Sequence, residues 1–146
     1  IIGAKKITNN ELLELPVDVL IPAAISDQIT NKNDKKIKAK IILEMANAPV
    51  APESDKALFS RGIKVVPDIL ANAGGVIVSY FEWVQNKTSS YWDIEQVDRE
   101  LNRHMVMAAR RTVVARQKYG VDLRTAAYIA ALDHIGKAYS VRGIFP

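Results

Sequence analysis

The sequence predicts an α/β fold, in which part of a wound, mostly parallel sheet is followed by a section of long helices. Three short runs rich in Val, Ile and Leu indicate the strands: VDVLIPAA (17–24), AKIILEMA (39–46) and IKVVPD (63–68). Helical segments separate them, as in βαβ units. Because each run is rich in Val, Ile and Leu on both faces, we expect a sheet covered on both sides. No such run follows residue 74, so we expect only helices beyond it.

Three helices are expected in the first half of the chain. The segment NNELLEL (9–15) has Asn9 or Asn10 as its N-cap. The polar segment ISDQITNKNDKKI (25–37) predicts a short helix. The segment ESDKALFSRG (53–62) ends in a glycine, which is typical of the residue just past a helix.

The second half predicts three further helices, over residues 74–87, 91–120 and 123–143. Apolar residues recur at helical spacing in them. Asp93 and Asp122 precede the second and third of these helices and are good N-cap residues. Glycine follows the last periodic residue of each of these two, which predicts where they end.

Composition narrows the function classes. The 146 residues are 49% hydrophobic and 25% charged, which is ordinary for a globular domain. There is no cysteine, and the two histidines, His104 and His134, have no metal-like spacing, so we expect no metal site. No run is long enough to span a membrane, and we expect no membrane partner and a cytoplasmic location.

The net charge of +4 does not indicate a nucleic-acid partner. The densest basic cluster, at 31–40, is interrupted by Asp34 and by apolar residues, so we interpret it as solvated surface and expect no nucleic acid to bind. Phosphate binding is the alternative for this cluster. The chain opens on IIGAKK, without methionine and with an apolar pair. We interpret this opening as the middle of a longer protein.

Small residues, Asn and Pro follow the predicted strands. They form PAA (22–24), ANAP (46–49) and PDILANAGG (67–75). Ligands of parallel α/β sheets bind outside the carboxyl ends of the strands. Small side chains leave the main chain approachable there, and Asn offers an uncharged donor and acceptor. The three strand ends are therefore candidates for one small-molecule site.

Gly74 and Gly75 open the helix that follows the third strand. They allow a planar ring or a carboxylate to come within hydrogen-bonding distance of the main chain, beside the partial positive charge of a helix N-terminus. Val76 and Ser79 are three residues apart and share one helix face, so they are candidates for a pocket wall. The alternative is that the glycines only permit tight packing of the helix on the sheet, with Ser79 an incidental helix residue.

Several stretches together resemble the glutamate dehydrogenases, within the family that also holds leucine, valine and phenylalanine dehydrogenases. The most specific is VPDILANAGGVIVSYFEWVQN (66–86). ELLELPVDVLIPAAISDQITNKN (11–33) and AKIILEMANAPVAPESDKALFSRG (39–62) resemble earlier parts of the same C-terminal half, and VDLRTAAYIAALDHIGKAYSVRGIFP (121–146) a later one. The likeness is collinear over essentially the whole chain, and SYFEWVQN after NAGGV favours the glutamate branch.

The resemblance implies a Rossmann-like domain and a reaction. Residues 1–86 would be a partial dinucleotide-binding domain without its first βαβ unit. Residues 87–146 would be a helical segment that returns toward a substrate domain absent from this chain. The implied reaction is reversible oxidative deamination of L-glutamate to 2-oxoglutarate and ammonium with NAD or NADP. The resemblance also implies a homo-hexamer for the full-length protein.

The resemblance assigns roles to seven residues. Two match the substrate pocket, Val76 and Ser79, and the Ser79 hydroxyl would bond the γ-carboxylate of glutamate. For Ala24 and Asn47 the alternative is a purely structural role in a turn. Asn72 would lie by the nicotinamide ribose, and Gly74 and Gly75 would lie beside the nicotinamide ring. The five cofactor positions are Ala24, Asn47, Asn72, Gly74 and Gly75.

No catalytic residue is expected in this chain. The sequence has no G-x-G-x-x-G turn, and no stretch resembles the family's N-terminal domain, which holds its catalytic lysine and aspartate. We therefore expect the isolated chain to be inert. Relatives usually have a small residue in place of Met45, and threonines in place of Val50 and Ala51. These departures permit a silent paralogue that acts as a structural or regulatory subunit, or a small-molecule-binding module.

Overall fold

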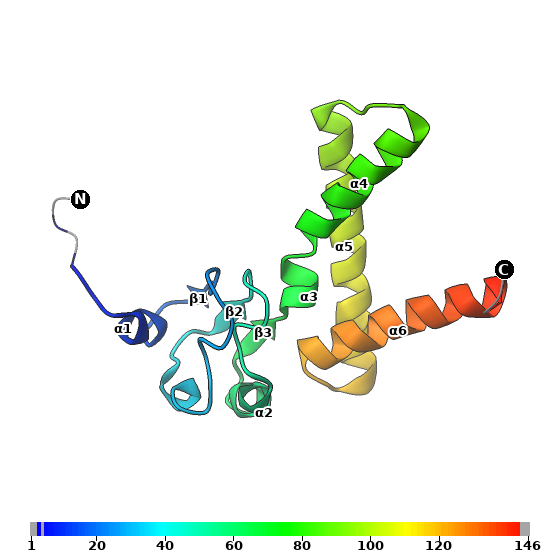
Figure 1. Cartoon of the computed structure of the whole chain (residues 1–146). Helices are drawn as coiled ribbons and strands as arrows, with labels where there is room; N and C mark the ends of the chain where they lie inside the picture. The colour runs from blue at the N-terminus through cyan, green and yellow to red at the C-terminus, as the bar shows by residue number, and fades with distance from the viewer. Residues whose placement is uncertain (1–2, 4, 144–146) are drawn as a thin grey trace. The chain divides into compact units, whose positions relative to one another are not determined.

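The computed structural model describes residue 3 and residues 5–143. The chain divides into two compact units, Ile1–Asp68 and Ile69–Pro146 (Figure 1). The first unit contains the sheet, and the second is helical. The expected α/β class, with a parallel sheet followed by long helices, is confirmed.

A three-stranded parallel sheet forms the centre of the first unit. Its strands are β1 (Val19–Leu20), β2 (Ile41–Leu43) and β3 (Lys64–Val66), in the order β1-β2-β3. Leu20 lies opposite Ile42 in the register. All three strands lie inside the predicted apolar runs but are shorter than them.

The core of the first unit combines one side chain each from β1, β2, α1 and α2 with side chains of the segments between these elements. The expectation that every strand is buried on both faces is wrong for β1, because Val19 is 45% exposed whereas the adjacent Leu20 is buried. The residues of β1 thus alternate between solvent and core. The expectation is also wrong for β3, in which Lys64 is exposed and the other two residues are half-buried. The buried core residues are Leu13, Leu20, Ile29, Ile37, Ala39, Ile42, Val50, Leu58 and Ile63.

The first helix, α1 (Asn9–Leu13), is capped by Thr8, so the expectation of Asn9 or Asn10 as N-cap is wrong. The Thr8 hydroxyl accepts a hydrogen bond from the Glu11 N–H at 3.2 Å, and the Glu11 carboxylate accepts one from the Thr8 N–H at 2.7 Å. This reciprocal pair is a capping box. It starts the helix at Asn9 and places both asparagines inside it.

The helix expected over 25–37 is reduced to one 3₁₀ turn, η1 (Asp34–Lys36). Ile29 forms a parallel β-bridge with the loop after β2. The Asn33 side chain accepts a hydrogen bond from the Thr30 N–H at 2.8 Å. These local and long-range bonds occupy backbone groups that a helix would have used.

Helix α2 (Pro52–Ser60) ends as the sequence predicts. Gly62, just past its C-cap, has a φ of +76°, which glycine adopts without strain. The C-cap residue, Arg61, donates from its guanidinium to the carbonyls of Asp34 and Ile37, the latter at 2.6 Å. These bonds tie the end of α2 to η1 inside the first unit.

Four helices follow the sheet: α3 (Asp68–Ala71), α4 (Gly74–Thr88), α5 (Ile94–Tyr119) and α6 (Leu123–Arg142). Within the second unit, α4 and α6 both pack against α5 (Figure 1). The three long helices confirm the predicted segments. The single turn of α3 lies in the stretch that we expected to be a strand end.

The predicted caps of α5 and α6 are confirmed. The Asp93 carboxylate accepts a hydrogen bond from the Gln96 N–H at 2.7 Å, and that of Asp122 accepts one from the Thr125 N–H at 2.9 Å. Gly120 ends α5 with a φ of +65°. No helix of the described residues is long and apolar enough to cross a membrane.

An aromatic cluster joins α4 to α5. Phe81 is buried, with ring centroids 5.2 Å from Trp92 and 5.6 Å from His104. His104 meets the Phe81 ring edge-on and is half-buried. It therefore serves helix packing, as its isolated position in the sequence predicts.

Candidate functional site

The loops after β1 and β2 are joined through their main chains. The Pro22 carbonyl accepts hydrogen bonds from the N–H groups of Met45 and Ala46, at 3.1 and 3.0 Å. The Asp27 N–H donates to the Ala48 carbonyl at 3.0 Å. The two loops thus form one edge of the first unit, at the carboxyl ends of the strands.

Ala24 and Asn47 lie on these two joined loops, and both are exposed. Folding therefore brings two of the predicted cofactor residues to the same edge, although they are separated by 22 intervening residues in the sequence. The carboxyl edge of a parallel sheet is where α/β domains bind nucleotides.

Ala48, next to Asn47, has a left-handed backbone with a φ of +46°. This conformation costs an L-residue about 1 kcal/mol. The residue is held on both sides, because its N–H donates to the Asp68 carboxylate at 2.8 Å and its carbonyl accepts from Asp27. The shape of this loop is thus fixed by tertiary contacts.

Glu44 is a functional candidate that the sequence analysis missed. Its side chain is fully buried at the end of β2. One carboxylate oxygen accepts a hydrogen bond from the Val50 N–H at 3.3 Å, and the other from the Asp68 N–H at 2.8 Å. A buried carboxylate is tolerated where such donors replace water. The available signal was one acidic residue directly after the apolar residues 41–43.

The predicted residues of the second unit gather at the start of α4. The Asn72 carbonyl accepts a long hydrogen bond, 3.4 Å, from the Gly75 N–H. Ala73, the N-cap residue, has a nearly helical backbone and receives no capping hydrogen bond from a described side chain. Asn72 and Gly74 are half-buried, and Gly75 is exposed.

Neither glycine is required by the fold of the described residues. A Cβ on Gly74 would lie 3.7 Å from Leu101, an ordinary contact, and one on Gly75 would meet no described heavy atom within 4 Å. Neither has a positive φ. The alternative that the pair serves only tight packing therefore has no support at Gly75.

Val76 and Ser79 follow on the exposed surface of α4. Val76 is 70% exposed, and Ser79 is exposed as well. Their spacing on α4 places them on one face, as predicted. They present an apolar group and a hydroxyl side by side.

The seven predicted residues thus form two groups, one in each compact unit. The residues of each group are exposed or half-buried, and they lie on loops or in the first turns of α4. The first group is Ala24 and Asn47, and the second is Asn72, Gly74, Gly75, Val76 and Ser79.

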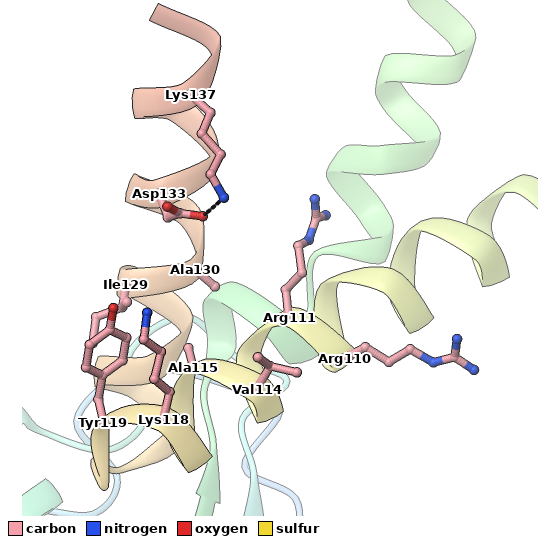
Figure 2. Close-up of a pocket in the computed structure, with 10 residues that line it drawn as sticks. All are labelled: Arg110, Arg111, Val114, Ala115, Lys118, Tyr119, Ile129, Ala130, Asp133 and Lys137. Atoms are coloured by element: carbon pink, nitrogen blue, oxygen red, sulfur yellow. Dashed lines mark hydrogen bonds and ion pairs between the residues drawn. The ribbon is translucent and has the colours of Figure 1, made fainter. Parts of the chain in front are cut away.

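A basic groove of about 350 Å³ lies between α5 and α6 (Figure 2). Asp133 forms an ion pair of 2.7 Å with Lys137, and the Lys118 ammonium lies 4.9 Å from the centroid of the Tyr119 ring. None of the described residues that line it is a predicted site residue. The lining residues are Arg110, Arg111, Val114, Ala115, Lys118, Tyr119, Ile129, Ala130, Asp133 and Lys137.

Among the described residues, no group of three or more His, Cys, Asp or Glu side chains is placed to hold a metal ion. His134 lines a mostly apolar groove of about 340 Å³ to which α3, α5 and α6 contribute. Neither histidine belongs to a metal-like cluster of the described chain.

Comparison with known proteins decides the family. The family model of Glutamate/Leucine/Phenylalanine/Valine dehydrogenase matches residues 2–143. The chain belongs to this family. Members of this family include amino-acid dehydrogenases. The assignment of the sheet to a Rossmann-like domain is consistent with membership of this family.

Curated relatives in the dehydrogenase family are close in sequence. The chain is 54% identical over 142 residues to a glutamate dehydrogenase of Thermotoga maritima, which covers 97% of the chain and 34% of that protein. It is 48% identical over 139 residues to an NADP-specific glutamate dehydrogenase of Synechocystis, covering 95% of the chain and 32% of that protein. The chain spans about a third of the length of these relatives.

Solved dehydrogenase structures have the same fold. A glutamate dehydrogenase from Peptoniphilus asaccharolyticus matches with a TM-score of 0.79 and 42% identity, over 86% of the chain and 32% of that structure's chain. A hetero-hexameric glutamate dehydrogenase from Thermus thermophilus matches with a TM-score of 0.88 and 28% identity, over 99% of the chain and 35% of that structure's chain.

The structure shows where two of the residues expected to depart from the dehydrogenase pattern lie. Met45 is 43% exposed, so its side chain is not core filler. Ala51 is the N-cap of α2, and no described side chain supplies a capping hydrogen bond there. Helix α2 therefore starts at Pro52 without a side-chain cap among the described residues.

Proposed function

We propose that the protein containing this chain catalyses the reversible oxidative deamination of L-glutamate to 2-oxoglutarate and ammonium with NAD or NADP. Membership of the dehydrogenase family and identities of 48–54% to curated glutamate dehydrogenases support this. The hydride would move between the α-carbon of glutamate and the nicotinamide ring. The protein's part is then to position both molecules and to exclude competing reactions.

Within that protein, residues 1–86 would supply the later part of the dinucleotide-binding domain, and residues 87–146 a helical segment. The loops bearing Ala24 and Asn47 would contact the cofactor. Asn72 would bond the nicotinamide ribose. Full-length copies would assemble as homo-hexamers.

The observation that carries the proposal is the open main chain at Gly75. Glycine near a helix start costs up to about 1 kcal/mol relative to alanine. A Cβ there would meet no described atom within 4 Å, and the φ is not positive, so neither packing nor conformation accounts for the residue. Access for a planar ring to the main chain does account for it.

Ser79 would give preference for glutamate. Its exposed hydroxyl would donate to the γ-carboxylate of the substrate, while Val76 would contact the aliphatic part. A site built to bond a polar group rejects analogues that lack it, since its own donor is then left unpaired.

No catalytic acid or base is proposed in this chain, and the isolated 146 residues would be inert. The test compares the full-length protein with the isolated chain for glutamate-dependent reduction of NAD⁺ and NADP⁺. We expect turnover from the full-length protein and none from the chain. A full-length protein that is folded but has no glutamate-dependent turnover would refute the activity.

A second candidate is a paralogue with weakened cofactor binding that acts as a structural or regulatory subunit. The exposed Met45 favours it, because a flexible side chain on the cofactor-side loop would crowd the cofactor. Titration of the full-length protein with NAD⁺ and NADP⁺ distinguishes an active dehydrogenase from a structural or regulatory subunit. Binding supports the enzyme, and its absence despite an intact upstream domain supports the subunit.

A further inference from the structure

The buried carboxylate of Glu44 has no role in the function proposed above, yet it bonds the main chain at two places, the end of the loop after β2 and the residue Asp68 after β3. One oxygen accepts from the Val50 N–H at 3.3 Å, where the loop ends. The other accepts from the Asp68 N–H at 2.8 Å, just after β3. The Glu44 backbone N–H itself donates to the Val66 carbonyl at 3.1 Å, which continues the pairing of β2 with β3.

Asp68 extends this contact into the loop itself. Its carboxylate accepts from the Ala48 N–H at 2.8 Å, and Ala48 is the residue with the left-handed backbone. The Ala48 carbonyl accepts from Asp27, on the loop after β1. Two carboxylates therefore hold a backbone that alanine does not favour.

Asn47 is the residue that this arrangement presents. It directly precedes Ala48 and is exposed, whereas Glu44 is fully buried. The Asp68 and Glu44 carboxylates thus bond the main chain of the loop at Ala48 and Val50, next to the exposed Asn47. An arrangement of this kind reduces the conformational freedom that a ligand would otherwise have to remove on binding.

We propose that Glu44, with Asp68, is a positioning residue for the cofactor: its buried carboxylate fixes the loop 45–50 so that Asn47 is preorganised to bind the dinucleotide. The inference rests on the proposed function, and specifically on a cofactor at this loop. Glu44 touches neither cofactor nor substrate in this account and acts through the loop alone.

The test uses the full-length protein with Glu44→Gln. The amide has the size of the carboxylate but replaces one accepting oxygen with a donor, so one of the two main-chain N–H groups loses its bond. We expect the Kd and KM of the cofactor to rise about tenfold, with kcat at saturating cofactor and the KM of glutamate changed by less than about twofold. Asp68→Ala removes the acceptor for Ala48 and should act in the same direction.

Asp34→Asn is the matched control. Asp34 is a second buried carboxylate of the first unit, on η1, and none of its described hydrogen bonds reaches residues 45–50. Its amide variant should leave the cofactor Kd within about twofold of the wild-type value. A tenfold rise in this control would overturn the inference, because the effect would then not be specific to the loop.

The remaining outcomes separate the two proposals. If the wild-type protein binds neither NAD⁺ nor NADP⁺, the proposed function fails, and the inference fails with it. If the wild-type protein binds and both Glu44→Gln and Asp68→Ala bind equally well, only the inference fails. A fall in kcat with an unchanged cofactor KM also contradicts it, since that pattern indicates a smaller folded fraction.

Discussion

The loop after β2 and the segment before α4 prepare their main chains for a ligand in opposite ways. The loop is fixed by side chains, because the carboxylates of Glu44 and Asp68 bond its N–H groups and hold Ala48 left-handed. The segment before α4 is open at Gly75, which has no side chain of its own. A Cβ added there would meet no described atom within 4 Å.

The difference teaches what each region requires. A loop that presents a side chain, Asn47, must be held from behind, and the buried carboxylates do this. A helix start that presents its main chain must be left uncovered, and glycine does this. Substitutions that release the loop should therefore lower both the stability of the protein and its affinity for the cofactor. Substitutions at the helix start should only block the access of the ligand to the main chain.

The largest expected effect is that of Gly75→Ala. The added methyl group should lower kcat/KM for glutamate about 100-fold in the full-length protein, by displacing the bound ring. Stability should stay the same or rise by up to about 1 kcal/mol, because alanine favours the helix and meets no described atom. Steady-state kinetics and urea unfolding measure the two quantities.

Gly136→Ala on α6 is the control for this variant, since a Cβ there also meets nothing described within 4 Å. It should give the same gain in stability and leave kcat/KM unchanged. If Gly75→Ala retains kcat/KM within about twofold, the helix start is not a ligand surface.

The next effect is that of Ser79→Ala. Loss of the hydroxyl should lower kcat/KM for glutamate between about tenfold and 100-fold, and should narrow the preference for glutamate over an uncharged aliphatic amino acid. Ser140→Ala, on α6, is the control and should change neither quantity. An equal loss for both amino acids would contradict a contact with the γ-carboxylate.

Ala48→Val tests the fixed loop. A β-branched side chain in the left-handed region should lower the free energy of unfolding by about 2 kcal/mol, opposite in sign to Gly75→Ala. Ala48→Gly should be neutral or stabilising, because glycine adopts this φ without strain. Denaturant unfolding of both variants would contradict the account if valine were tolerated as well as glycine.

The smallest effect concerns the start of α6, which is capped, whereas that of α4 is not. Partial burial acts to raise the pKa of Asp122, but hydrogen bonds from Thr125 and nearby backbone N–H groups outweigh it and hold the pKa below the ordinary value of 3.8. Because the pKa is lower in the folded state, this stabilisation is present above the ordinary pKa and is lost as the pH falls through the folded value.

Asp122→Ala should therefore lower stability at neutral pH by about 1 kcal/mol. Asp122→Asn should retain most of the cap and lose the acid dependence below about pH 4, since the amide does not titrate. Unfolding measured at neutral and acid pH checks both. An Asn variant as acid-sensitive as the wild type would contradict the role of this carboxylate.

Local patterns predicted most of the fold. The three strands lie in apolar runs, and the caps Asp93 and Asp122 bond residues only three positions away, so a short window contains the whole interaction. The prediction of a helix over residues 25–37 was wrong because Ile29 instead pairs with the loop after β2. That partner lies about 20 residues away, beyond any local pattern.

The residues of the candidate site also divide into those that a local pattern predicts and those that depend on distant contacts. The NAGGV stretch is contiguous, so its glycines and Ser79 could be identified from the sequence. Glu44 could not, because its burial depends on the packing of β2, and Asp68, one of its partners, is 24 residues later in the chain. One acidic residue in an apolar run does not by itself indicate a buried, fully bonded carboxylate.

The most direct test of the central claim is a crystal structure of the full-length protein with oxidised cofactor and glutamate bound. We predict the nicotinamide against the main chain of Gly74 and Gly75, and the γ-carboxylate within hydrogen-bonding distance, about 3 Å, of the Ser79 hydroxyl. A structure in which other side chains cover the Gly74–Gly75 main chain, away from both ligands, would contradict the account.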